Sequence, residues 1–228
     1  MTSVTGPMAC HATRHRRGLR WTSWPATSSG RNAGRDRPWT NLAPLEIARP
    51  GSLSRAPVVA AGGWTGLAAG LSPWGPEMDF NVQHDTRAAE IVAATAELTL
   101  APLPVTLTAQ LRAADLPRLR AAGPLGELLA RQGEAHGHDF QMTQLGRLHA
   151  GLPDDLLNFH YDPVACAVAL GWPGATVAEI RLQLVRDGEL LRFRPGAAGR
   201  PMRMLTDLDP GSFTEYWLNA VEAAQSPA

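Results

Sequence analysis

The fold is decided by the stretch Ala56-Pro57-Val58-Val59-Ala60-Ala61-Gly62-Gly63. Its apolar residues predict a buried strand, and the two glycines predict a loop directly after that strand. A second apolar run, 98–103, is closed by Pro104. Between the two runs, residues 86–96 have the apolar spacing of a helix. Buried strands that alternate with helices are typical of an α/β protein.

The same reading extends outward along the chain. Before the first strand, Thr40 or Asn41 can cap a short helix that ends near Pro50-Gly51. After the second strand, the pattern predicts helices at 113–122, 124–136 and 210–224, a helical start at 163–170, a hairpin of 178–185 with 190–194, and a strand at 202–208. We therefore expect an open, mostly parallel sheet flanked by helices, with a small antiparallel addition near the C-terminus.

The composition limits the class of protein. The 228 residues are 44% hydrophobic and 18% charged, which is typical of a globular chain. The formal net charge is zero, so no overall field draws the chain to nucleic acid or to an anionic membrane. No apolar run of about 18 residues predicts a membrane span. Cys10 and Cys166 are interpreted as free thiols, and a cytoplasmic location is the simplest interpretation.

Residues 1–37 differ from the rest of the chain. They are rich in arginine, contain no acidic residue before Asp36, and show neither helical nor alternating periodicity. Arginines interleaved with Trp21 and Trp24 would suit RNA binding, but a disordered or non-homologous segment is the interpretation we favour. We expect residues 1–37 to be such a segment and 38–228 to form the folded part.

Six short motifs follow one another in the folded part. They are Pro38-Trp39-Thr40-Asn41-Leu42-Ala43, Val58-Val59-Ala60-Ala61-Gly62-Gly63, Met78-Asp79-Phe80-Asn81, Asp85-Thr86-Arg87-Ala88-Ala89, Pro104-Val105-Thr106 and Tyr161-Asp162-Pro163. In this order and spacing they resemble motifs of the nucleoside hydrolase family, the inosine-uridine-type ribonucleoside hydrolases. The resemblance covers roughly residues 38–224, and it implies that 38–228 is the C-terminal part of such a domain.

The resemblance implies hydrolysis of the N-glycosidic bond of ribonucleosides, with one calcium ion at the carboxyl ends of the strands. Asp79 and Asn81 fall on the ribose-binding positions of the family, with aspartate in place of the usual glutamate. If this stretch is extended, Phe80 points to the opposite face and leaves Asp79 and Asn81 together. The alternative is that both side chains only satisfy backbone groups of a loop.

Asp162 falls on a late calcium ligand of the family, although a carboxylate there also suits the N-cap of a helix. The family has a histidine just before this aspartate, which protonates the departing base. Here that position is Tyr161, and His160 lies one residue earlier. A phenol with an ordinary pKa near 10 is a poorer acid at neutral pH than an imidazole near 6.5. Tyr161 and His160 therefore both remain candidates, and the base preference stays open.

Two other histidine segments are less informative. His136-Gly137-His138-Asp139 could suggest a metal, but calcium prefers oxygen, and a mobile loop is the interpretation we favour. His84 could line the site near Asn81, and a surface or capping role is equally compatible with its position.

The family's N-terminal D-x-D-x-x-x-D-D cluster has no counterpart in this sequence, which has no Asp or Glu before Asp36. Calcium needs six to eight oxygens, which Asp79, Asn81 and Asp162 cannot supply alone. Two hypotheses follow: an N-terminally truncated hydrolase that is inactive alone, or a non-catalytic remnant that binds a partner chain or a nucleoside weakly. A nucleoside is the expected small-molecule substrate, nucleic acid and membrane are not expected partners, and association into a homo-oligomer stays open.

Overall fold

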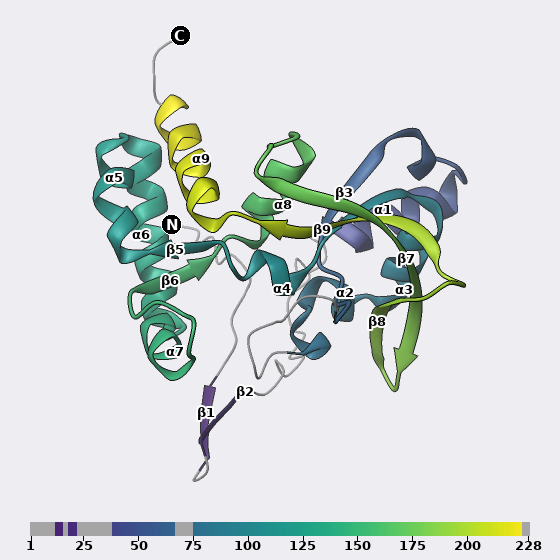
Figure 1. Cartoon of the computed structure of the whole chain (residues 1–228), viewed down its shortest axis with the longest axis horizontal. Helices are drawn as coiled ribbons and strands as arrows, with labels where there is room; N and C mark the ends of the chain where they lie inside the picture. The colour runs from purple at the N-terminus through teal and green to yellow at the C-terminus, as the bar shows by residue number, and fades with distance from the viewer. Residues whose placement is uncertain (1–11, 16–17, 22–37, 67–74, 225–228) are drawn as a thin grey trace.

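The main sheet has five strands in the order β3-β4-β9-β7-β8 (Figure 1). The computed structural model describes residues 12–15, 18–21, 38–66 and 75–224. The strands of the main sheet, in chain order, are β3 (Pro57–Ala61), β4 (Glu97–Ala101), β7 (Ala175–Asp187), β8 (Leu190–Pro195) and β9 (Arg200–Leu208). Two further pairs are antiparallel: β1 (Ala12–His15) with β2 (Gly18–Trp21), and β5 (Gln110–Arg112) with β6 (Leu156–Phe159).

The main sheet is mixed. β3 pairs with β4 and β4 with β9 in parallel, whereas β9 with β7 and β7 with β8 are antiparallel. The expected α/β sheet flanked by helices, with an antiparallel addition near the C-terminus, is confirmed, although the antiparallel pairings are as many as the parallel ones. The expected hairpin around Asp187-Gly188 is present, and its long strand β7 also pairs with β9, so the antiparallel strands join the parallel ones in one sheet.

Helices cover both faces of this sheet. The α-helices are α1 (Pro38–Ala48), α2 (Phe80–His84), α3 (Thr86–Thr95), α4 (Leu103–Thr106), α5 (Leu116–Ala121), α6 (Pro124–Asp139), α7 (Met142–Leu148), α8 (Tyr161–Ala169) and α9 (Pro210–Ala223). The short 3-10 helices are η1 (Leu53–Arg55), η2 (Pro76–Met78) and η3 (Ala113–Asp115). In the described part of the chain, no helix has the length and apolar character to cross a bilayer.

Alternation along β3 divides the core into two layers. Val58 and Ala60 pack with α1 and α3 on one face of the sheet, in a cluster that includes Trp39 and Val92. Val59 and Ala61 point to the other face, where α8 and α9 pack. Successive strand residues face opposite sides, so a strand that is apolar at every position must be covered twice. The apolar run 56–61 thus explains the helix–sheet–helix layering.

Most expected elements are confirmed, with some changes of boundary. α1 begins at Pro38, so the expectation that Thr40 or Asn41 caps it is wrong, because both lie inside the helix. β4 ends at Ala101, and Pro104 lies in the first turn of α4, where its missing N–H is not needed for the helix. α6 continues to Asp139, so the segment His136-Gly137-His138-Asp139 lies in a helix, and the expected loop is wrong.

Within residues 1–37 the structure describes 12–15 and 18–21, which pair as the β1–β2 hairpin, although no periodic pattern predicted it. The rest of this segment lies outside the described residues. The division of the chain at residue 37 stays a prediction.

Small residues let α6 pack closely on its neighbours. Its buried residues are Gly126, Ala130, Gly133 and Gly137, spaced along one face. A Cβ on Gly126 would lie 1.9 Å from the carbonyl oxygen of Leu119 in α5. Because that atom belongs to the backbone, a side chain here would push α5 and α6 apart.

We expect Gly126→Ala to lower the free energy of unfolding by about 1–3 kcal/mol, because overpacking outweighs the roughly 1 kcal/mol helix-propensity gain of alanine. Urea denaturation followed by circular dichroism measures the change. Gly211→Ala is the matched control, since a Cβ on this exposed glycine of α9 has its nearest neighbour at 3.4 Å. Equal unfolding midpoints for the two variants would contradict the close α5–α6 packing.

Candidate functional site

A double-glycine turn follows β3 at the edge where the parallel strands β3 and β4 end. Gly62 N donates to Ala101 O at 2.9 Å, which extends the pairing by one residue. Gly62 and Gly63 have φ values of 127° and 100°, in the region that favours glycine. A Cβ on Gly62 would lie 2.9 Å from Oδ1 of Asp79. The two glycines therefore let the backbone approach the carboxylate closely.

Asp79 lies beneath this turn and caps α2. Its Oδ2 accepts from Gly63 N at 2.6 Å and Trp64 N at 3.1 Å, and its Oδ1 accepts from Val82 N at 3.4 Å. The residue is only 2% exposed. Burial raises the pKa of Asp79 to about 6, against the opposing effect of the three amide donors. Residues 79–81 are not extended, because a helix begins at Phe80, so the side-chain alternation considered for an extended stretch does not apply.

Asn81 and Gln83 extend these contacts along α2. Asn81 Nδ2 donates to Ala61 O at 3.1 Å. Gln83 Nε2 donates to Leu191 O at 2.8 Å, and Gln83 Oε1 accepts from Leu191 N at 2.9 Å, so this side chain joins α2 to β8. Sequence reasoning missed Gln83, because a glutamine in a helix gives no signal of a distant backbone partner. Asp79, Asn81 and Gln83 all bind backbone groups, as the alternative reading supposed, and the ribose role stays a prediction.

His160 is buried at the junction of β6 and α8. It is 5% exposed, and its ring centroid lies 4.4 Å from Trp217 and 5.6 Å from Phe213, both in α9. Its Nε2 is buried without a hydrogen-bond partner. Burial lowers the pKa of His160 to about 4, because the charged form is poorly solvated there. The imidazole is therefore neutral at pH 7 and covered by α9.

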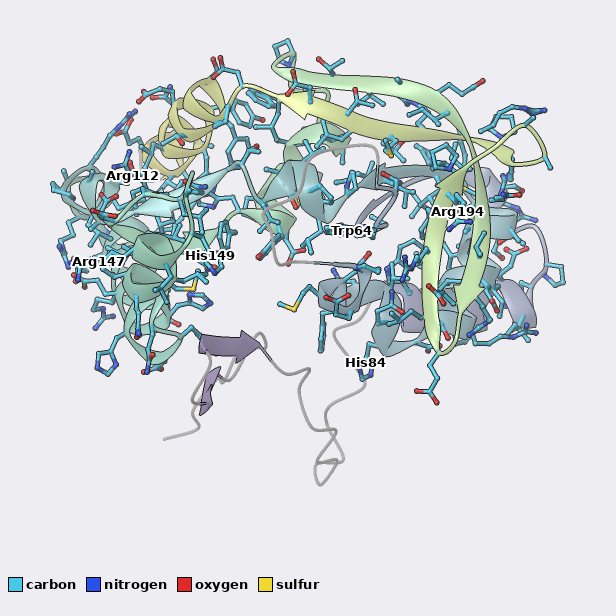
Figure 2. The ribbon with its side chains drawn as sticks, turned by 60° about the horizontal axis from the view of Figure 1, so that its bottom comes forward. Trp64, His84, Arg112, Arg147, His149 and Arg194 are labelled. Atoms are coloured by element: carbon cyan, nitrogen blue, oxygen red, sulfur yellow. The ribbon has the colours of Figure 1, made fainter. Side chains whose placement is uncertain are left out.

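Tyr161 is the first residue of α8 and is half-buried. Its ring centroid lies 5.6 Å from that of Phe159. Tyr161, Trp64 and Met78 all pack against the same apolar cluster, which is built from Leu103, Leu107, Met142, Leu145, Leu152, Leu156 and Phe159. The turn after β3 and the start of α8, about 100 residues apart in sequence, are thus brought to one cluster. Figure 2 shows Trp64 between the parts of the molecule that carry Arg112 and Arg194.

Asp162, next to Tyr161, is exposed at the start of α8. Partial desolvation raises its pKa above the usual value. The N-cap of α8 is His160, so Asp162 is not the N-cap that its position allowed. Among the described residues, no group of three or more His, Cys, Asp or Glu side chains could hold a metal ion. Asp162 and Asp79 therefore do not form a calcium site there on their own.

The two remaining histidine segments lie outside this arrangement. His136 Nδ1 lies 2.9 Å from Leu157 O, a contact between α6 and β6, whereas His138 is exposed beside Asp139. His84 is exposed at the end of α2, with its ring centroid 5.4 Å from that of Phe80. Figure 2 shows His84 pointing away from Trp64.

Sequence comparison finds relatives among bacterial hydrolases. The chain is 38% identical over 117 residues to the pyrimidine-specific ribonucleoside hydrolase RihA of Salmonella schwarzengrund, a match that covers 49% of this chain and 34% of the relative. The same enzyme of Salmonella arizonae matches at 38% over 96 residues, or 41% of this chain and 30% of the relative. The matches thus span about a third of the length of these relatives. No family model matches the chain.

Solved structures share the fold. The purine-preferring ribonucleoside hydrolase of Gardnerella vaginalis superimposes with a TM-score of 0.67 at 19% identity, covering 91% of this chain and 70% of that protein. The inosine-uridine preferring nucleoside hydrolase of Bacillus anthracis gives 0.56 at 21%, covering 82% of this chain and 58% of that protein. In its fold the chain is similar to these nucleoside hydrolases, and over about half of its length it is similar in sequence to the pyrimidine-specific ribonucleoside hydrolases.

Proposed function

We propose that this chain carries the sugar-binding and leaving-group parts of a nucleoside hydrolase site. The reaction is hydrolysis of the N-glycosidic bond of ribonucleosides to free base and ribose. The observation that carries the proposal is the packing of Trp64, Met78 and Tyr161 on one apolar cluster, which brings the two motif segments together. The identity to a ribonucleoside hydrolase over about half of this chain supports the same reaction.

Two side chains have proposed roles in the reaction. The amide of Asn81, in α2 next to the end of β3, would contact a ribose hydroxyl. Water adds to the anomeric carbon as the C–N bond breaks, and the departing nitrogen takes up a proton. Tyr161 is the proposed donor of that proton. The burial of His160 under α9 and its lowered pKa support Tyr161 over His160.

Calcium, which the family resemblance implies, does not fit the described residues as they stand. Asp162 is an exposed carboxylate and could contribute oxygen ligands, but no second or third acidic side chain joins it in the described part of the chain. Calcium takes six to eight oxygens. We therefore assign Asp162 as a candidate ligand only and derive no catalytic step through the metal.

The second candidate function is that of a non-catalytic chain that binds a nucleoside weakly or binds a partner chain. It is favoured by the absence of any acidic residue before Asp36 in the sequence. A catalytic water needs a carboxylate to orient and deprotonate it. The first candidate releases free base only when further oxygen ligands are supplied to the site, whereas the second never releases it.

We expect the purified 228-residue chain to release free base from inosine or uridine no faster than buffer, with or without added calcium, because no group of three or more metal-ligating side chains among the described residues could hold an ion and its water. Chromatographic detection of hypoxanthine and uracil measures release. The Salmonella RihA enzyme, assayed with uridine, is the positive control. Calcium-dependent release of base by this chain that is abolished in Asp162→Ala would show that other oxygens complete the site.

A separate prediction concerns His160. Its folded-state pKa of about 4 lies below the ordinary value of 6.5, so the unfolded chain binds more protons between these values. Stability should therefore fall as the pH drops from about 6.5 to 4, by up to about 3 kcal/mol from this group. His160→Phe should reduce this loss. We would measure the free energy of unfolding in urea at pH 7.5 and 5 for both proteins. Subtracting the pH-dependent change of the variant from that of the unsubstituted chain removes contributions of other groups, such as Asp79.

His138→Gln is the control, because His138 is exposed and should change the pH dependence little. If His160→Phe left the pH dependence of stability unchanged, His160 would be solvated and able to ionise. His160 would then again be a candidate proton donor, as Tyr161 is.

A further inference from the structure

The carboxylate of Asp79 accepts three hydrogen bonds, all from backbone amides. One oxygen accepts from two consecutive amides, those of Gly63 and Trp64, and the other accepts from Val82 N. At 2% exposure, Asp79 presents almost no surface to a ligand. A group that binds a sugar hydroxyl needs an accessible oxygen with a free lone-pair direction. The surroundings of Asp79 therefore suit holding the backbone in place rather than binding a sugar.

The turn that Asp79 holds controls the position of Trp64. The carbonyl oxygen of Trp64 accepts from Phe193 N in β8 at 3.1 Å, and the indole packs against the cluster that Tyr161 also contacts. Gly62 and Gly63 have no Cβ to restrict their dihedral angles, so the turn needs an outside partner to keep one conformation. Asp79 is that partner, because it accepts hydrogen bonds from two amides of the turn.

We propose that Asp79 is a positioning residue, whose carboxylate holds the turn of Gly62, Gly63 and Trp64 and thereby fixes Trp64 on the apolar cluster against which Tyr161 also packs. Asp79 does not itself contact the sugar. This assignment goes beyond the proposed function. It rests on that function only in treating the surroundings of Tyr161 as a nucleoside site. Contact with ribose is left to Asn81, whose side chain is less deeply buried and uses its Nδ2 for Ala61 O.

The charge of Asp79 should matter for this task. Hydrogen bonds to an ionised carboxylate are about twice as strong as bonds between neutral groups. Burial raises the pKa of Asp79, and the amides of Gly63, Val82 and Trp64 lower it by less. No charged side chain of the described residues contributes to it. The carboxylate is thus ionised at pH 7.5 and becomes neutral as the pH falls through about 6, which weakens its hold on the turn.

The test is amide hydrogen exchange of the full chain, resolved at Gly63 and Trp64 and expressed as protection factors. Asp79→Ser keeps a side chain that can cap α2 but is too short to reach the turn. Asp85→Ser is the matched control, because Asp85 caps the next helix by accepting from Ala88 N at 2.9 Å.

In Asp79→Ser we expect protection at Gly63 and Trp64 to fall about ten- to a hundredfold, whereas Asp85→Ser should leave both amides unchanged. In the unsubstituted chain, both amides should lose protection severalfold with a common midpoint near pH 6. Equal protection in Asp79→Ser and the unsubstituted chain would overturn the proposal.

If Asp79→Ser unfolds, the pH series of the unsubstituted chain decides, and the absence of a shared midpoint at Gly63 and Trp64 would overturn the proposal. Direct contact with sugar is tested by adding D-ribose and following the carboxyl carbon resonance of Asp79. A shift there that saturates with ribose would also refute the assignment. Neither measurement needs turnover, so failure of the proposed hydrolase function leaves this inference standing.

Discussion

The close approach of the Gly62–Gly63 backbone to the buried carboxylate of Asp79 is the constraint on which the site depends. A Cβ at Gly62 would meet that carboxylate at 2.9 Å, and Gly63 N already lies 2.6 Å from it. An isolated buried charge is costly, and here backbone amides offset the cost. The turn, the N-terminus of α2 and the end of β3 are consequently held as one unit.

The two candidate proton donors, His160 and Tyr161, differ in how they are buried. His160 is enclosed by α9 and is kept neutral by desolvation, whereas Tyr161, one residue later, begins α8 and packs on the cluster shared with Trp64. A change of one position at a helix start rotates the side chain by about 100°. Neighbouring residues in the sequence therefore have different environments, and only Tyr161 packs on the cluster that Trp64 also contacts.

The mixed sheet explains how distant segments reach the site. β3 and β4 run parallel, so the loops after them emerge at the same edge. The hairpin of β7 and β8 extends the sheet through β9, and β8 then contacts the turn through Phe193 and α2 through Gln83. An element near the C-terminus thus supports a turn that belongs to the first motifs of the chain.

The sequence by itself determined the α/β class, the strands near 56–61 and 202–208, the helix near 86–96 and the resemblance to nucleoside hydrolases, because apolar runs, helical spacing and ordered motifs are local patterns. It also predicted that Asp79 and Tyr161 belong to a site. Tertiary structure alone decided that the sheet is mixed, that Asp79 faces backbone amides, and that His160 is covered by α9. Those outcomes depend on strand partners and long-range burial, which no local pattern encodes.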